Sequence, residues 1–597
     1  MKKKLISILL IFLLIIVALL LIAYVTNSEF KGSFPRSQVS YYDGHMTSVP
    51  QILVHRIKAE PFNLVALLIF ICAIVHTLMT SYFHRMAHDA EHECEELKAK
   101  GKIDKAYQSV EAGVFHLLGE VEVVFGIWAI VLAAAVAIFY DWKVFVTYIS
   151  GIHYREPLFI IVIMTIASSR PIIKFFEFLT WRVVKLLGNT IEAWWLTILI
   201  LAPILGSFIT EPAAMTICAY LLSEKIYQLG PSRKLRYATL ALLFVNISIG
   251  GALTNFAAPP ILVVAEPWEW DALYMLLHFG WKSVVAIVIS TLAYFFLLRD
   301  DIQALREPYQ HYQYKRYIQR RFIHNTELEE SFQQLSTIVD NKLGFSAELE
   351  AYSDILKGNM KDLAKKRLTP EELDKFDVED AIEEKYEDIH QEMLKKILPG
   401  LLPEDRRPEY RDPHWNTRPG RVPAWIVLVH LGFLIWTVVN NHNTVLFLSG
   451  FLFFLGFFQV SIYYQNRIDL KPSLLVAFFL AGLMIHGNLQ SWWIGPLLGN
   501  LPELGLNATS ILLTAFNDNA SITYLSTLVP GLSESLKYAI VSGAITGGGL
   551  TIIANAPNPV GQSILKKHFG RGISAGMLFR YALLPTLVAA LVFFLFR

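Results

Sequence analysis

Long apolar segments recur along the chain and are separated by short polar stretches. A run of about twenty apolar residues is long enough to cross a bilayer as a helix. Such segments lie near 61–82, 118–140, 157–175, 193–226, 236–265 and 272–298, and again near 423–440, 443–464, 472–490, 500–530, 537–565 and 573–596. The pattern predicts an all-α polytopic membrane protein.

Four of these segments are irregular. The segments 193–226 and 500–530 carry a polar cluster at their middle, and 236–265 and 537–565 are interrupted by Gly, Thr, Asn and Pro. Irregular backbone at membrane depth persists only where protein or a water-filled cavity satisfies its polar groups. We therefore predict two re-entrant hairpins and two broken transmembrane helices.

The distribution of Lys and Arg predicts the direction of each crossing. If each hairpin enters and leaves the membrane on the same side, Lys and Arg are about three times as frequent in the inner loops as in the outer ones. This predicts about eleven crossings with a cytoplasmic N-terminus. The apolar segment after Lys2, Lys3 and Lys4 is interpreted as an uncleaved first span, with a cleaved signal peptide as the alternative.

The two halves of the chain resemble each other in three stretches that occur in the same order. "FITEPAAMT" (208–216) aligns with "FNDNASIT" (516–523), "GGALTNFAAPP" with "GGGLTIIANAP", and 274–297 with 576–596. This alignment places Glu211 opposite Asp518, Thr210 opposite Asn517, Thr216 opposite Thr523 and Thr254 opposite Thr551. Six elements with five crossings per half make the second copy inverted, an arrangement typical of secondary transporters.

The repeats predict four parts: an N-terminal anchor with an outer loop (1–60), a first membrane repeat (61–299), a cytoplasmic helical insertion (300–421) and a second, inverted repeat (422–597). The insertion is rich in charged residues and includes a capping-box pattern from Thr369 to Glu372. Two roles are open for the insertion: it regulates the protein or docks a partner, or it is a solvated connector between the two membrane halves. The net charge of +1 gives no reason to expect nucleic acid as a partner.

Polar residues at the hairpin tips and helix breaks are the candidate site. A carboxylate at membrane depth is costly unless it is paired or neutralised. A proton and a metal ion are alternative ways to neutralise it, and oxygen ligands suit sodium. The predicted residues for cation binding and proton coupling are Asp518, Asn519, Asn517, Glu211, Thr210, Thr254, Asn255, Thr551 and Asn555, with Glu120 and Glu122 as accessory candidates.

At these residues the sequence resembles the ion transporter superfamily, which includes NhaD-type sodium/proton antiporters and divalent-anion/sodium symporters. The Asp518–Asn519 pair resembles the acid–amide pair of the NhaD-type proteins. The resemblance implies an elevator-like secondary transporter, a homodimer in the bacterial inner membrane. The first tip departs from the symporters, since it reads Thr-Glu-Pro, and the first broken helix carries the uncharged "TNFAAPP" where the NhaD-type proteins have an acid.

The predicted function is exchange of sodium for protons by alternating access. The alternative is a sodium-coupled symporter of a carboxylate or other small anion, although acids at both tips would repel such a substrate. The chain has no HExxH or P-loop motif, so an enzyme is not expected, and neither is a cofactor beyond the transported ions. His84, His88, His92 and Cys94 form a weak alternative metal site in a charged loop.

Overall fold

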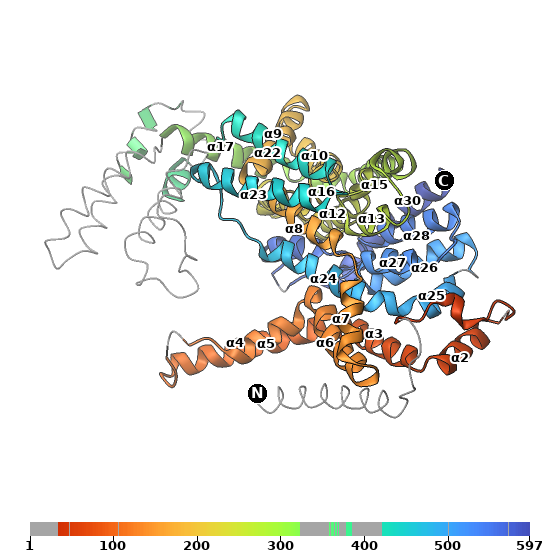
Figure 1. The fold of residues 1–597 in the computed structure, drawn as a ribbon. Helices are drawn as coiled ribbons and strands as arrows, with labels where there is room; N and C mark the ends of the chain where they lie inside the picture. The colour runs from red at the N-terminus through yellow and green to blue at the C-terminus, as the bar shows by residue number, and fades with distance from the viewer. Residues whose placement is uncertain are drawn as a thin grey trace. The chain divides into compact units, whose positions relative to one another are not determined.

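The computed structural model describes residues 34–46, 48–104, 107–322, 421–498, 501–570 and 572–597, with short pieces between 357 and 384. The predicted first span and the predicted capping box of the insertion lie outside these residues. The described residues form helices and connecting loops, and none of them is in a strand (Figure 1). The chain divides into two compact units, one made of 1–298 and 421–597 and the other of 299–420.

The larger unit begins with helices that precede the first hairpin. They are η1 (Gln38–Tyr41), α2 (Val49–Ala59), α3 (Phe62–Leu78), α4 (Thr80–Ala99), α5 (Val110–Gly119), α6 (Val121–Phe139), α7 (Trp142–Ser150), α8 (Arg155–Ala167) and α9 (Arg170–Leu186). The hairpin and the elements after it are α10 (Ile191–Gly206), α11 (Glu211–Lys225), η2 (Tyr227–Leu229), α12 (Arg233–Gly250), η3 (Gly251–Leu253), α13 (Pro259–Ala265), α14 (Ala272–Met275), η4 (Leu276–Gly280) and α15 (Trp281–Leu297).

The second half of this unit has a similar order of elements. They are α22 (Ala424–Val439), α23 (Thr444–Val460), η8 (Ile462–Tyr464), α24 (Lys471–Gly487), η9 (Asn488–Gln490), α25 (Ser491–Leu498), α26 (Glu503–Phe516), α27 (Asn519–Thr527), α28 (Glu534–Gly547), α29 (Asn558–Leu565), η10 (Lys566–Phe569) and α30 (Ala575–Leu595).

Among the described residues, five helices are long and apolar enough to cross a membrane. They are Val121–Phe139, Arg233–Leu253, Ala272–Leu297, Lys471–Leu498 and Ala575–Leu595. The number rises to seven if two bent pairs, α2 with α3 and α7 with α8, each count as one span. The protein is therefore an integral membrane protein, and the expected eleven crossings remain a prediction.

The four irregular segments of the sequence are interrupted where the glycines, prolines and polar residues predict. The segment 193–226 is two helices, α10 and α11, and 500–530 is α26 and α27. Helix α12 ends at Gly250, and helical geometry resumes only at Pro259 after a short η3 turn. Helix α28 ends at Gly547, and α29 begins at Asn558.

Helices from the two halves pack against each other around these interruptions. Helix α13 packs on α27 (Figure 1), and α11 packs on α29, so each half contributes an element to the other. Helix α30 packs along both α12 and α15. The two hairpins and the two broken helices therefore form one packed body.

Other segments differ in detail from the hydropathy pattern. The predicted span 157–175 is divided at Ser168 and Ser169, where α8 ends and α9 begins with Pro171 in its first turn. A proline in the first turn fits a helix start, because its missing N–H has no intrahelical partner there. Helices α4 and α5, which carry most of the first charged loop, pack as an antiparallel pair beside the apolar segments.

The smaller unit begins with α16 (Arg299–Gln303) and α17 (Arg306–Phe322). Its remaining described residues form short helical pieces that ion pairs connect, including Lys365 Nζ with Glu379 Oε1 at 2.5 Å. The lysine beside Glu379 holds the pKa of that carboxyl below its usual value. These pairs are exposed to solvent and contribute little to stability.

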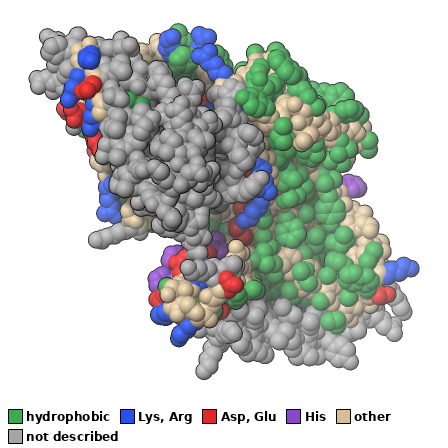
Figure 2. Space-filling view, turned by 90° about the vertical axis from the view of Figure 1, so that its left-hand side faces the viewer, with side chains coloured by type: hydrophobic (Ala, Val, Ile, Leu, Met, Phe, Trp, Pro, Cys, Tyr) green, Lys and Arg blue, Asp and Glu red, His purple; other side chains and the backbone are tan. Residues whose placement is uncertain are grey.

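Hydrophobic side chains cover a broad area of the surface in Figure 2, with few charged residues among them. Large apolar side chains that are exposed include Leu277, Phe296, Leu428, Phe453 and Leu587. Soluble monomers rarely expose apolar areas of this extent. This surface is suited to contact with lipid.

Candidate functional site

The first hairpin turns at residues 207–210, between α10 and α11. Thr210 is the N-cap of α11, and its Oγ1 accepts a hydrogen bond from the N–H of Ala213 at 3.4 Å. Glu211 is the first residue of the helix, and only 1% of it is exposed. The tip therefore holds a carboxylate inside the protein at a helix N-terminus, where the helix dipole favours negative charge.

The second hairpin turns at Asn517 and Asp518, between α26 and α27. Asp518 is the N-cap, and its Oδ1 accepts from the N–H of Ala520 at 2.8 Å. Asn517 Oδ1 accepts from the N–H of Asp518 at 3.0 Å and so shapes the turn. Asp518 and Asn519, the first residue of α27, are both buried. This tip therefore also places a carboxylate at a helix N-terminus.

Each helix break is tied to the hairpin of its own half by an equivalent threonine. Thr254 Oγ1 donates to the carbonyl of Ser207 at 2.7 Å, and Thr551 Oγ1 donates to the carbonyl of Ala515 at 2.8 Å. The two carbonyls are at or just beyond the ends of α10 and α26, which lack helical partners for their last carbonyls. The threonines therefore satisfy backbone groups that an interrupted membrane helix would leave open.

A second pair of equivalent hydrogen bonds joins the backbones. The N–H of Glu211 donates to the carbonyl of Ala257, and the N–H of Asn519 donates to the carbonyl of Ala554, each at 3.1 Å. Glycines of the two breaks also lie in equivalent places, each against the first helical residue of its own hairpin tip. A Cβ placed on Gly251 would collide with Glu211, and one on Gly548 would lie 2.9 Å from Nδ2 of Asn519.

These contacts define which positions of the two tips are equivalent. Glu211 corresponds to Asn519, and Thr210 corresponds to Asp518. The sequence alignment that placed Glu211 opposite Asp518 is wrong by one residue. It brings the two acids into register only by a gap at Ile209, which is left without a counterpart in the second hairpin. The hydrogen bonds require no such gap, so the two carboxylates occupy different positions in their hairpins.

One contact of the cluster crosses between the halves. Asn555, in the second helix break, donates from Nδ2 to Oε2 of Glu211 at 3.0 Å, and both residues are buried. The position equivalent to Asn555 in the first break is Ala258, since Ala257 corresponds to Ala554. Asn519 therefore faces no equivalent amide from the other half.

Several polar atoms of this cluster are buried and make no hydrogen bond within the protein. They are Oε1 of Glu211, Oδ1 of Asn555, both amide atoms of Asn519 and Oγ of Ser521. More than nine in ten buried polar groups in proteins have a partner, so a group of exceptions is informative. Four of the five atoms are oxygens, the donor type that binds sodium.

Three carboxylates are electrostatically linked here. The charge of Asp518 acts on Glu211, and the charge of Glu122 acts on Asp518. Glu122 is in the first turn of α6, and the neighbouring Glu120, whose Oε1 is 3.6 Å from Lys471 Nζ, is the N-cap residue of that helix. Of the two accessory candidates, only Glu122 is therefore connected with the tip cluster.

The remaining predicted residue points elsewhere. Asn255 donates from Nδ2 to the carbonyl of Trp270 at 3.3 Å, beyond the end of α13. The hydrogen bonds of Thr210, Thr254, Thr551 and Asn517 all go to backbone groups. These residues hold the tips and breaks in place, and the carboxylates and amides of Asp518, Asn519, Glu211 and Asn555 form the centre.

Three residues of the site were not predicted. Ser248 of α12 donates to the carbonyl of Ile545 at 2.7 Å and lies against Gly548, beside Asn519. Asn558 donates to the carbonyls of Gly548 and Thr551, each at 2.8 Å, across the second break. Ser521 is in the first turn of α27. Asn558 stands in the motif "ANAPNP", which could have indicated it, whereas Ser248 and Ser521 have no distinguishing sequence signal.

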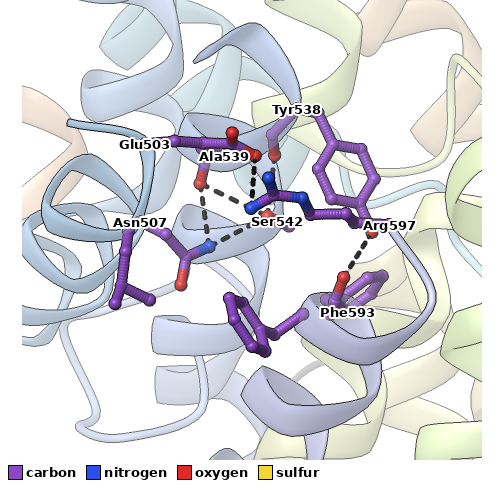
Figure 3. A pocket seen from close by; sticks show the side chains of 9 residues that line it. Glu503, Asn507, Tyr538, Ala539, Ser542, Phe593 and Arg597 are labelled. Carbon is purple, nitrogen blue, oxygen red and sulfur yellow. Dashed lines mark hydrogen bonds and ion pairs between the residues drawn. The ribbon is translucent and has the colours of Figure 1, made fainter. Parts of the chain in front are cut away.

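A pocket lies at the start of the second hairpin, between α26, α28 and α30 (Figure 3). Glu503 Oε1 is 3.0 Å from Nη1 of Arg597, and Asn507 Nδ2 donates to the carbonyl of Ala539 and to Oγ of Ser542, each at 2.9 Å (Figure 3). The pocket is small, and its lining side chains are already paired. We assign it a structural role in closing the hairpin.

Outside the apolar segments, Arg56 connects the chain segment before α2 with helix α25. Its Nε is 2.5 Å from Asp43 Oδ2, and its Nη1 donates to the carbonyl of Trp492 at 2.6 Å. The hydrogen bond from Arg56 holds the pKa of the Asp43 carboxyl below its usual value. This clamp restrains the segment from which the second hairpin begins.

The charged loop helix α4 gives no support for the alternative metal site. His92 Nδ1 is 3.5 Å from Glu96, and Cys94 is buried. In the ranges that the structure describes, no three His, Cys, Asp or Glu side chains are grouped so that they could hold a metal ion.

Comparison with known families identifies the class of the protein. The sequence profile of the family described as "Putative Na+/H+ antiporter" matches residues 61–323 and 400–596, which is most of the chain. The protein belongs to this family. Membership makes it a membrane transporter of sodium and protons rather than an enzyme. No curated protein matches the chain.

Proposed function

We propose that the protein exchanges sodium for protons across the membrane by alternating access, and that the tip cluster is the exchange site. The observation that carries this proposal is the cluster itself. Carboxylates from both halves, Glu211 and Asp518, are buried within electrostatic range of each other and beside oxygens that lack hydrogen-bond partners. Two such charges are unfavourable together unless a cation or a proton neutralises one of them.

The same set of residues can therefore bind either a sodium ion or a proton, but not both with full affinity. Sodium would be held by carboxylate and amide oxygens of the kind found at Asp518 and Asn519. A proton on a carboxylate removes the negative charge that attracts sodium. This competition converts two binding events into an exchange, since each cargo lowers the affinity for the other.

The remaining architecture is part of the proposal. Two inverted repeats and eleven crossings are supported by the equivalent contacts at the tips and by the excess of Lys and Arg in the inner loops. Movement of the hairpins and broken helices as one body is supported by their packing across the halves. The protein is proposed to act as a homodimer in the bacterial inner membrane, with a cytoplasmic N-terminus and a regulatory role for residues 300–421.

The experiment follows the interior pH of sealed vesicles that contain the full-length protein, after sodium is added inside or outside. The unmodified protein is expected to move protons against the sodium flux, and Asp518→Asn is expected to abolish the response. Asp141→Asn is the matched control, because Asp141 is also an N-cap that accepts a hydrogen bond from the second residue after it. It should respond like the unmodified protein.

Two results would contradict the proposal. One is an unchanged pH response in Asp518→Asn. The other is accumulation of labelled succinate or citrate by the unmodified protein without any sodium-driven pH change, which would indicate anion symport instead.

A further inference from the structure

The two hairpin tips are not chemically equivalent although their backbones are arranged alike. The first tip has Thr210 as N-cap and Glu211 at the first helical position, and the second has Asp518 and Asn519 at those positions. The acid and the uncharged residue are thus exchanged between N-cap and first turn. The partners from the opposite half differ as well, since Asn555 reaches Glu211 while Ala258 occupies the equivalent position.

We propose that the two tips bind different ions: Glu211 with Asn555 carries the proton, and Asp518 with Asn519 binds the sodium ion. This inference rests on the proposed exchange function and assigns a separate role to each carboxylate. Neither assignment follows from the sequence, because the sequence alignment treats the two acids as counterparts.

The two unpartnered acceptor atoms beside each other in this pair favour the neutral form of Glu211. Its carboxylate receives one hydrogen bond, from Asn555, and the N–H of Glu211 itself is used by the carbonyl of Ala257. The other oxygen, Oε1, and the amide oxygen of Asn555 are both buried acceptors without a donor. A single proton on Oε1 supplies the donor that this pair lacks, because a carboxylic acid and a primary amide can form two reciprocal hydrogen bonds.

The backbone hydrogen bonds of Asp518 favour its ionised form. At the N-cap its carboxylate accepts a hydrogen bond from the backbone N–H of Ala520, whereas the carboxylate of Glu211 accepts from the side chain of Asn555. Both amide atoms of the adjacent Asn519 are buried and unpartnered, as is Oγ of Ser521. A sodium ion beside Asp518 would use these oxygens, whereas a proton would leave them unsatisfied.

Electrostatics couples the two positions. The charge of Asp518 acts on Glu211 within the buried cluster, and because the interaction between two charges is mutual, an ionised Glu211 strengthens the attraction of this region for sodium. Protonation of Glu211 removes that charge. Sodium binding and protonation therefore oppose each other without sharing a ligand, and by linkage the effect is the same in both directions.

The variant Glu211→Gln tests the separate roles of the two carboxylates independently of the proposed exchange function. In vesicles, the variant is expected to retain exchange of labelled sodium for unlabelled sodium and to lose sodium-driven proton movement. Glu211→Asp should keep proton movement with a displaced pH midpoint. The matched control is Glu192→Gln, in the first turn of α10 of the same hairpin, which should behave like the unmodified protein.

Asn555→Ala tests the pair in a second way. Loss of the amide oxygen that accepts the proton of the neutral acid is expected to shift the pH midpoint of transport downward by about one unit, equivalent to a tenfold change in proton affinity. A purely structural role for Asn555 would lower the rate at every pH without moving the midpoint. This variant keeps the inference testable if Glu211→Gln does not fold.

The assignment is overturned if Glu211→Gln still drives proton movement, or if it is folded and loses sodium/sodium exchange as completely as Asp518→Asn does. An unshifted pH midpoint in Asn555→Ala would also overturn it. Absence of sodium-driven proton movement in the unmodified protein would instead refute the exchange function on which the assignment rests.

Discussion

The two hairpins have the same backbone contacts with their broken helices, but the first helix of each presents a different surface. Four equivalent pairs show this difference: Trp195 and Glu503, Leu199 and Asn507, Ala202 and Ser510, and Gly206 and Thr514. On α10 none of the four side chains is a carboxylate, an amide or a hydroxyl, whereas on α26 every one of them is. In the first half the polar side chains of this contact come from α12, where Thr239 accepts from Trp195 Nε1 at 2.9 Å and Asn246 donates to the carbonyl of Leu199 at 2.8 Å, so the polar series on α26 has no counterpart on α10.

The largest expected effect comes from giving the second tip the N-cap of the first. Asp518→Thr keeps a residue that caps helices well, so the fold should be retained. The carboxylate is lost, and sodium-driven proton movement in vesicles should disappear. The elution volume in size-exclusion chromatography serves as the folding control, and a correctly folded variant with full exchange would show that the tips do not differ in function.

The next effect concerns the amide that only the second break possesses. Asn555→Ala makes that break like the first and leaves Glu211 buried without a donor, which costs about 1–3 kcal/mol of stability. Thermal unfolding in detergent measures the loss. In Glu211→Ala/Asn555→Ala the two effects should not add, because one interaction is removed twice; simple addition would mean that the residues act independently.

A third prediction concerns the clamp beside the second hairpin. Asp43→Asn removes the carboxylate that pairs with the buried Arg56 and should lower the unfolding temperature at neutral pH. Because the folded protein has the lower pKa, the stabilisation from Asp43 is present above the unfolded pKa of about 4 and is lost as the pH falls through the folded value. The difference between variant and unmodified protein should therefore shrink in acid, and a difference independent of pH would argue against the ion pair.

A smaller effect is expected from Asn507→Leu, which gives α26 the residue found on α10. Two hydrogen bonds to α28 are lost and some apolar packing is gained, so the net cost should be about 1 kcal/mol. Thermal unfolding and the vesicle assay together report it. Loss of transport out of proportion to the loss of stability would place Asn507 in the exchange machinery.

The smallest effect is predicted for Glu503→Gln in the pocket of Figure 3. The ion pair with Arg597 is partly exposed, and such pairs contribute less than about 1 kcal/mol. The change should be further reduced at high salt. A large, salt-independent loss of stability would mean that the pocket is a closed part of the core.

The sequence indicated the helix breaks because they follow from local chemistry. Gly250 and Gly251 have low helix propensity, and Pro259 and Pro260 lack the N–H that a helix interior needs, so the end of α12 at Gly250 and the new start of α13 at Pro259 follow from residue type. The positions of the polar tips were predictable for the same reason. The order and boundaries of the apolar helices also agree closely with the hydropathy pattern, with the division at Ser168 and Ser169 as the clearest exception.

The register between the tips could not be predicted in this way. Aligning Glu211 with Asp518 by type is reasonable when only letters are compared, but the equivalence is set by hydrogen bonds such as those to Ala257 and Ala554. The link between Glu211 and Asn555 joins residues that are 344 positions apart. Nothing in the local pattern of either segment indicates that contact.

The most direct test of the account is the sodium affinity of the purified full-length protein, measured by binding of labelled sodium across a series of pH values. If a proton and sodium oppose each other in the tip cluster, affinity should fall by about tenfold or more from alkaline to acidic medium. Glu211→Gln should bind sodium with an affinity that no longer changes with pH. An affinity of the unmodified protein that is the same at every pH would contradict the account.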